Sequence, residues 1–267
     1  MIKYSKITLK SGFVLPYRFI GSTVRGAFGH GLKKVVCINP SGVCEGCFAK
    51  EECLFYDFFE NKSPKYRLKI DLSGNVSFDL FLFEEYAKKS PYVVSALYKA
   101  FKQIGIGKHK QKIDFKMFYN DKLIFDGADF KEFNNEVKEY GVKDIKSQCR
   151  LVFVTPIRIK ENNRFVREKI KPETVLRSIH HKINKLQNIP LSRLPFKPKY
   201  KISDEKFSFN ELRRYSNRQK RGMNFGGITG YIDFEYIDEK SYYLLKIGEL
   251  VGVGKQTTFG LGSIEIM

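Results

Sequence analysis

The segments LVFVTPIRI at residues 151–159 and PETVLRSIHHKINKLQ at residues 172–187 carry the clearest strand and helix signals of the chain. Apolar and polar side chains alternate along much of the first segment, a pattern typical of a β-strand. The second opens on a proline, which suits the first turn of a helix, and its apolar residues recur every three or four positions. They are Val175, Leu176, Ile179, Ile183 and Leu186. A strand followed by an amphipathic helix is therefore predicted here.

The first half of the chain shows the same succession. A strand is predicted at residues 4–9 and a helix at residues 22–34, which Ser22 is placed to cap. Further strands and a second helix follow in each half: 66–72, 76–83 and a helix from Ser90 in the first, and 230–236, a helix near Lys240 and a strand at 263–266 in the second. The order β-α-β-β-α-β thus occurs twice. It predicts an α+β fold of two tandem ferredoxin-like domains.

A chain of 267 residues has room for two such domains. We predict them at residues 1–146 and 147–267. The first contains a cysteine-rich insertion at residues 37–60, and the second contains a glycine-rich loop near its end.

Basic residues greatly outnumber acidic ones. The chain has 48 Lys and Arg against 29 Asp and Glu, a net charge of +19. Residues 151–221 alone hold 19 basic and 6 acidic side chains, a net charge of +13. So concentrated a positive charge favours a polyanionic partner, nucleic acid foremost. A soluble basic protein with solvated charged faces is the alternative.

The N-terminal residues lack the apolar core of a signal peptide, and no run approaches the ~18 apolar residues of a membrane span. We expect a cytoplasmic protein without membrane association. Because the cytosol keeps thiols reduced, four cysteines within a short segment indicate a metal site rather than disulfides. They are Cys37, Cys44, Cys47 and Cys53, and the spacing of the middle pair is typical of a zinc knuckle. The segment predicts a structural zinc, with an iron–sulfur cluster or unligated thiols as alternatives.

The sequence GVGKQTTFGLG at residues 252–262 is the second distinctive segment. Glycines let a backbone approach a phosphate, successive N–H groups can form an anion-binding nest, and Lys255 adds a charge. The spacing of a nucleotide-binding P-loop is missing, and a strand follows instead of a helix. We predict a phosphate-binding loop, and a plain turn is the alternative.

Several segments together resemble one protein family. GSTVRGAFGH at residues 21–30 is similar to the start of the first helix in the RAMP superfamily of CRISPR proteins. Further segments follow in the order found in one branch of this superfamily. They are the cysteine cluster with residues 53–60, TPIR at 155–158, RYSNRQ at 214–219 with Gly226 and Gly227, and the glycine-rich loop. That branch is the precursor-crRNA-processing endoribonucleases. One departure is Gly252, where relatives often carry a histidine.

The resemblance implies an enzyme that cleaves CRISPR repeat RNA without a catalytic metal. A ribose 2′-hydroxyl would attack the adjacent phosphate and leave a cyclic phosphate and a 5′-hydroxyl. Such a reaction needs a base, an acid and cations beside the phosphate. The implied partners are the repeat RNA and subunits of a CRISPR effector complex.

His30 is the leading candidate for the acid or base. The resemblance puts that role on the first helix, and Gly26, Gly29 and Gly31 around it would leave space for a ribose. The alternatives are His181, His180 and Tyr215.

The predicted RNA contacts are mostly basic residues, because Arg forks beside aromatic faces suit phosphates and unstacked bases. The alternative for the cluster around Tyr215 is a basic helix end packed over the sheet. The predicted contacts are Arg25, Arg177, Arg214, Arg218, Lys220, Arg221, Lys255 and Gln256.

Two other functions are compatible with parts of the sequence. A non-catalytic RAMP subunit that holds crRNA in an effector complex would share the fold and the charge. A zinc-ribbon regulator that binds DNA would need a groove-reading helix near the cysteines, and the sequence offers none.

Overall fold

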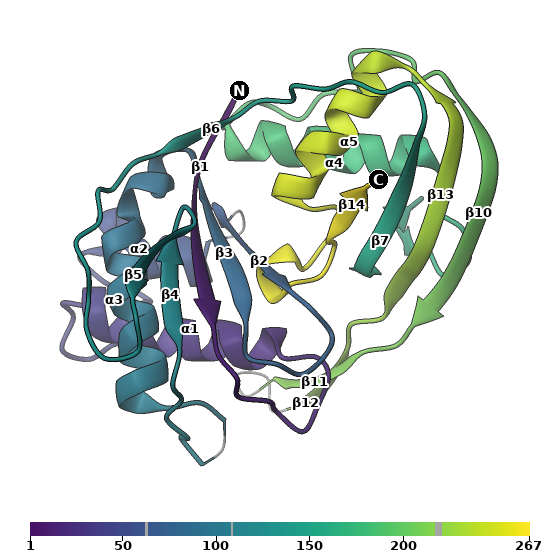
Figure 1. The fold of residues 1–267 in the computed structure, drawn as a ribbon. Coiled ribbons are helices and arrows are strands. Elements are labelled where there is room, and N and C mark those ends of the chain that lie inside the picture. The colour runs from purple at the N-terminus through teal and green to yellow at the C-terminus, as the bar shows by residue number, and fades with distance from the viewer. Residues whose placement is uncertain (62–63, 108, 217–220) are drawn as a thin grey trace. The chain divides into compact units, whose positions relative to one another are not determined.

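The computed structural model of the chain describes residues 1–61, 64–107, 109–216 and 221–267 (Figure 1). The chain divides into two compact units, Met1–Glu139 and Tyr140–Met267. The observed division lies within β6 (Lys138–Tyr140), which pairs with β1 (Ile2–Lys10), and so falls a few residues before the predicted one.

The first unit has one antiparallel sheet. Its order is β2-β3-β1-β4-β5, so the first four strands have the 2-3-1-4 order of a ferredoxin-like domain. The elements are β1, α1 (Gly21–Val36), α2 (Leu54–Phe59), β2 (Tyr66–Ile70), β3 (Phe78–Phe83), α3 (Ser90–Tyr98), β4 (Lys116–Tyr119), β5 (Lys122–Phe125) and β6. Single helical turns lie at Lys50–Glu52 and Glu84–Lys89, and a π-helical turn lies at Lys99–Ile104.

The core of the first unit includes an apolar stripe of α1. Val24, Phe28 and Leu32 are fully buried. Gly31 lies against α3 so closely that a Cβ there would sit 2.1 Å from the Ala96 carbonyl oxygen. Ser22 is not the helix cap that we predicted: it lies inside α1, whose cap position is Ile20.

The second unit repeats the arrangement. Its sheet order is β10-β13-β7-β14, again 2-3-1-4, and α4 and α5 pack together on one face of this sheet (Figure 1). The elements are β7 (Cys149–Ile157), β8 (Lys160–Glu161), β9 (Arg164–Phe165), α4 (Pro172–Leu186), β10 (Tyr200–Asn210), β11 (Arg213–Ser216), β12 (Arg221–Asn224), β13 (Gly227–Ile237), α5 (Glu239–Val251), a turn at Thr257–Phe259 and β14 (Ile264–Ile266). The prediction of two tandem ferredoxin-like domains is confirmed.

Five strands of the second unit were not expected from the sequence. β10 had no predicted counterpart, and the β8–β9 hairpin was missed. The segment around Tyr215 is a strand, β11, paired with β12, and not the helix end considered as an alternative. Among the described residues, no helix is long and apolar enough to cross a lipid bilayer.

Candidate nucleic-acid interface

A cleft of about 250 Å³ lies on the second unit, where α4, the segment after β7 and the glycine-rich loop meet. Five of the side chains that line it carry a positive charge, and none of its described lining residues is acidic. The basic residues are Lys160, Arg177, Lys182, Lys185 and Lys255. The predicted contacts Arg177 and Lys255 are thus brought together, with three further lysines beside them.

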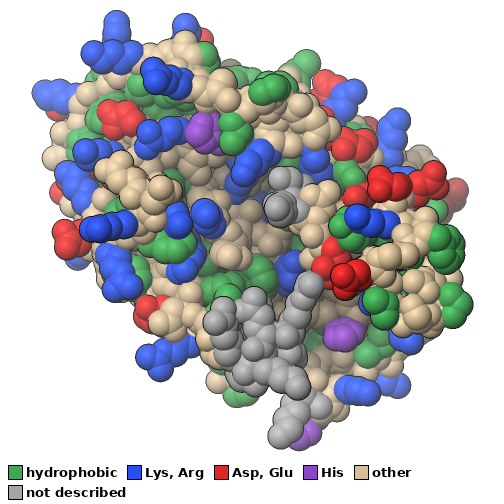
Figure 2. Space-filling view, turned by 180° about the vertical axis from the view of Figure 1, so that it is seen from behind, with side chains coloured by type: hydrophobic (Ala, Val, Ile, Leu, Met, Phe, Trp, Pro, Cys, Tyr) green, Lys and Arg blue, Asp and Glu red, His purple; other side chains and the backbone are tan. Residues whose placement is uncertain are grey.

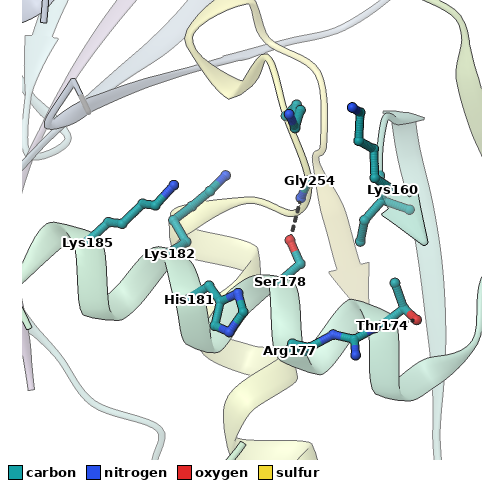
Figure 3. Close-up of a pocket in the computed structure, with 10 residues that line it drawn as sticks. Lys160, Thr174, Arg177, Ser178, His181, Lys182, Lys185 and Gly254 are labelled. Atoms are coloured by element: carbon teal, nitrogen blue, oxygen red, sulfur yellow. Dashed lines mark hydrogen bonds between the residues drawn. The ribbon is translucent and has the colours of Figure 1, made fainter. Parts of the chain in front are cut away.

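The side chains of the cleft come from different elements. Lys182 and Lys185 extend from α4 on the side of the glycine-rich loop, and Lys160 reaches in from β8 (Figure 3). Arg177 and His181 are one turn apart on α4 and lie next to each other in the same view. Over the wider surface, Lys and Arg side chains are more frequent than Asp and Glu on the face in Figure 2. This concentration of cations suits a chain of phosphates.

Hydrogen bonds donated by its own backbone N–H groups fix the glycine-rich loop in place. The Gly254 N–H donates to the Ser178 hydroxyl at 2.8 Å, and the Lys255 N–H donates to the Arg158 carbonyl at 2.8 Å. The N–H groups of Val253 and Gly262 also donate to backbone carbonyls. These four groups are therefore not free to form the predicted anion nest. The loop contributes the exposed Lys255 side chain instead.

The glycines of this loop serve close packing. Gly254 has a φ of +71°, and a Cβ there would lie 2.6 Å from the Arg158 carbonyl oxygen. A side chain at this position would strain the backbone and push the loop away from the end of β7.

His181 lines the cleft, and one contact defines the tautomer of its ring. Its Nε2 lies 3.0 Å from the carbonyl oxygen of Ser192. Because a carbonyl can only accept, Nε2 carries the proton, and in the neutral ring Nδ1 is left as the basic nitrogen. An imidazole so oriented, beside Lys182 and Lys185, has the chemistry of an acid–base group near a phosphate.

His180 lies outside this cleft. Its Nε2 is 3.0 Å from the Ser192 hydroxyl, and it lines a separate cavity with Pro195 and Phe196. Burial lowers its pKa, the neighbouring His181 acts in the same direction, and a hydrogen bond that the ring donates to the Arg193 backbone opposes them. His180 therefore anchors the segment after α4.

His30 is exposed on α1 of the first unit. Two of the glycines around it have a packing role, because a Cβ at Gly29 would meet the Phe59 ring at 2.8 Å and one at Gly31 would meet α3. Gly29 and Gly31 therefore do not leave room for a ribose, and that part of the prediction is wrong. Gly26 is exposed, and a Cβ there would meet no atom within 4 Å. The catalytic role of His30 stays a prediction.

The remaining predicted contacts are spread over both units. The Arg25 guanidinium lies over the Phe59 ring, 4.8 Å from its centroid, in the first unit. Gln256 is half-buried in the glycine-rich loop and has a φ of +66°. Arg218 and Lys220 lie outside the described residues, as do the side chains of Arg214, Tyr215 and Arg221 on β11 and β12.

The sequence did not single out Lys160, Lys182 or Ser178. Lys182 follows the two histidines directly and lies one turn from Ser178 and Lys185, so helical spacing alone could have placed Lys182 and Ser178 beside Lys185 on one face of the helix. Lys160 enters the cleft on the β8–β9 hairpin, which the sequence analysis missed.

The four cysteines predicted to bind zinc lie between α1 and α2, and all are half-buried thiols. Cys37, Cys47 and Cys53 line one cavity of about 510 Å³. Burial raises the pKa of Cys44, the charge of Lys33 opposes this rise, and Glu60, Cys53 and Cys37 add to it. Within the described ranges, no three His, Cys, Asp or Glu side chains are arranged to hold a metal ion. The thiols lie in one short segment but are not arranged as a preassembled metal site, and zinc stays a prediction.

Two family models match the chain. Residues 4–135 match a model described as an N-terminal domain, and residues 151–264 match CRISPR-associated endoribonuclease Cas6. An uncharacterized protein of Archaeoglobus fulgidus is 22% identical over 93% of this chain and 91% of its own length.

Solved Cas6 structures have the same fold. A Cas6 product complex has a TM-score of 0.56 at 15% identity, and a Cas6 substrate mimic complex has 0.52 at 16%, both over 100% of each chain. Thermus thermophilus Cas6 has a TM-score of 0.51 at 14% identity, over 100% of this chain and 98% of its own. Together with the family model over the second unit, this fold confirms the resemblance seen in the sequence. Residues 151–264 thus match the family of CRISPR-associated endoribonuclease Cas6, and the whole chain shares the fold of solved Cas6 structures.

Proposed function

We propose that the chain is a metal-independent endoribonuclease that binds CRISPR repeat RNA in the cleft of the second unit and cuts precursor crRNA. The observation that carries the proposal is the convergence of Lys160, Arg177, Lys182, Lys185 and Lys255 around one cleft with His181. Cations of this density neutralise consecutive phosphates, and a lysine beside the reacting phosphate stabilises the charge that develops on it.

The reaction needs no metal or water as reactant. The ribose 2′-oxygen attacks the adjacent phosphorus while its proton passes to a base, and the bond from phosphorus to the 5′-oxygen breaks. An acid gives that oxygen a proton. The products are a cyclic phosphate on one fragment and a 5′-hydroxyl on the other. An imidazole can serve as the base in one form and the acid in the other.

Two imidazoles are proposed for this role. His30 is favoured by the family resemblance and is exposed on α1. His181 is favoured by the geometry of the second unit, because it lines the basic cleft with a defined tautomer. Single alanine variants separate the two.

A subunit that holds processed crRNA without cutting it is the second candidate, since the same cations would bind either RNA. The test is incubation of the purified protein with the repeat RNA, with and without EDTA, followed by analysis of the product ends. One cut per repeat, unaffected by EDTA and ending in a cyclic phosphate, supports the enzyme. Tight binding without a cut supports the holding subunit.

We also propose that Cys37, Cys44, Cys47 and Cys53 bind a structural zinc. The support is their chemistry and their shared, half-buried neighbourhood at the end of α1. Four thiolates leave a zinc ion no open position, so its role would be to stabilise the segment between α1 and α2.

A further inference from the structure

The β8–β9 hairpin stands at the margin of the basic cleft. Its turn residues Asn162 and Asn163 have φ values of +46° and +63°, as in a type I′ turn. Lys160 pairs directly with Phe165 across the hairpin. Opposed residues of an antiparallel pair lie on the same face, and Lys160 lines the cleft. Phe165 therefore lies on the face of the hairpin that carries this lysine.

Contacts to both walls of the cleft hold the hairpin in place. The Thr174 hydroxyl of α4 donates to Glu161 Oε1 at 2.5 Å. Arg158, just before the hairpin, accepts the Lys255 N–H of the glycine-rich loop through its carbonyl oxygen. Because the hairpin is tied at these points, it presents its side chains with little loss of conformational entropy on binding.

Two arginines lie over two phenylalanine rings here, and we call Arg158, Phe165, Arg167 and Phe209 the Arg–Phe cluster. The guanidinium of Arg158 is 3.9 Å from the centroid of Phe165, and that of Arg167 is 5.4 Å from the centroid of Phe209. The ammonium of Lys160 is 5.1 Å from the Phe165 centroid. Both rings are half-buried, so neither belongs wholly to the core.

Proteins that bind single-stranded RNA combine a basic track for the backbone with aromatic side chains on which bases stack. The cleft provides the track, and Phe165 provides an aromatic ring next to Lys160 at the margin of the cleft. Asn162, Asn163 and Arg164 around the turn are all exposed, and the half-buried Phe165 follows them directly, so part of its ring is open to solvent.

We propose that Phe165, supported by Arg158, stacks on an unpaired nucleobase of the RNA that occupies the cleft. The inference rests on the proposed RNA-binding function and adds a base contact to it. Phe165 is a positioning residue: it holds a base and takes no part in proton transfer.

The test uses the full chain and the repeat RNA with 2-aminopurine at single unpaired positions, since stacking changes the fluorescence of this base. Phe165→Leu keeps an apolar side chain and loses the stacking face, whereas Phe165→Trp keeps the face. Tyr236→Leu removes an exposed ring elsewhere in the second unit and is the control. Thermal unfolding of each variant shows whether the fold is retained.

We expect one 2-aminopurine position to respond on binding to wild type and to Phe165→Trp, but not to Phe165→Leu. Affinity should fall about five-fold or more in Phe165→Leu, the usual scale for losing a stacked base. The salt dependence of binding should not change, because no phosphate contact is lost. The control should bind as wild type does.

Three results would overturn the inference: no responding position in wild type, equal affinity for Phe165→Leu and wild type, or a loss in Phe165→Trp as large as in Phe165→Leu. The last would show a packing role. If Phe165→Leu still binds RNA, and removal of the cleft lysines weakens binding, the proposed function is unaffected. Wild-type protein that binds no repeat RNA would defeat the proposed function itself.

Discussion

The hydroxyl of Ser178 accepts a hydrogen bond from the backbone N–H of Gly254 at 2.8 Å (Figure 3). This contact joins the middle of α4 to the glycine-rich loop, and Lys182, one turn further along α4, donates to the Thr257 hydroxyl of the same loop. The two walls of the cleft are thus held at a fixed separation. The position of the Lys255 side chain relative to the α4 lysines depends on these contacts.

Replacing Ser178 by Ala should loosen the loop. The Gly254 N–H would lose its acceptor in a half-buried place, which costs about 1–3 kcal/mol of unfolding free energy. RNA affinity should fall as well, because Lys255 is no longer held. Chemical denaturation and filter binding measure the two effects. Ser178→Thr keeps the hydroxyl and should restore both, and an alanine variant with wild-type stability would show that the contact does not matter.

The His variants should separate chemistry from binding. If His181 is the acid or base, His181→Ala should bind repeat RNA nearly as wild type does and cut it ~10²-fold or more slowly, the usual scale for losing such a group. The same loss in His30→Ala would give the role to the first unit. Single-turnover cleavage measures both. His180→Ala is the neighbouring control, and wild-type rates in all three variants would exclude these three imidazoles as the acid or base.

The fold was predictable because its signals are local. The stripe of Val24, Phe28 and Leu32 and the alternation at residues 151–159 each specify one element, and their order specifies the topology. The site was predictable only in part. The charges and the imidazole of Arg177, His181 and Lys255 can be recognised from the sequence. The cleft itself depends on contacts between segments far apart in the chain, such as the hydrogen bond from the Lys255 N–H to the Arg158 carbonyl. The nest prediction failed for the same reason, since the acceptors that occupy the loop N–H groups lie elsewhere in the sequence.

Acid should destabilise the protein through His180. Burial holds its pKa below the ordinary value, so below pH ~6.5 the unfolded chain binds a proton that the folded chain resists. The free energy of unfolding should therefore fall as the pH drops from about 7.5 to about 5. His180→Gln should show a smaller fall, measured by denaturation at each pH. An identical pH dependence in the variant and in wild type would contradict this role.

Zinc should be bound in about one equivalent per chain. Metal analysis of the purified protein measures it, and Cys44→Ser with Cys47→Ser should remove the ion and lower the unfolding temperature. Cys149→Ser, at the buried thiol of β7, is the control and should leave the metal content unchanged. Metal-free protein of normal stability would argue against the site.

The salt dependence of RNA binding in a double variant tests the basic cleft most directly. Lys182→Ala with Lys185→Ala removes two cations from the cleft, and Lys143→Ala with Lys206→Ala removes two exposed cations of the same unit outside it. Both variants have the same net charge. For single-stranded RNA, losing two phosphate contacts should reduce the slope of log affinity against log salt concentration by about 1.4. We predict this reduction and a weaker affinity for the cleft variant alone, and equal slopes in the two variants would contradict the assignment of the cleft as the RNA site.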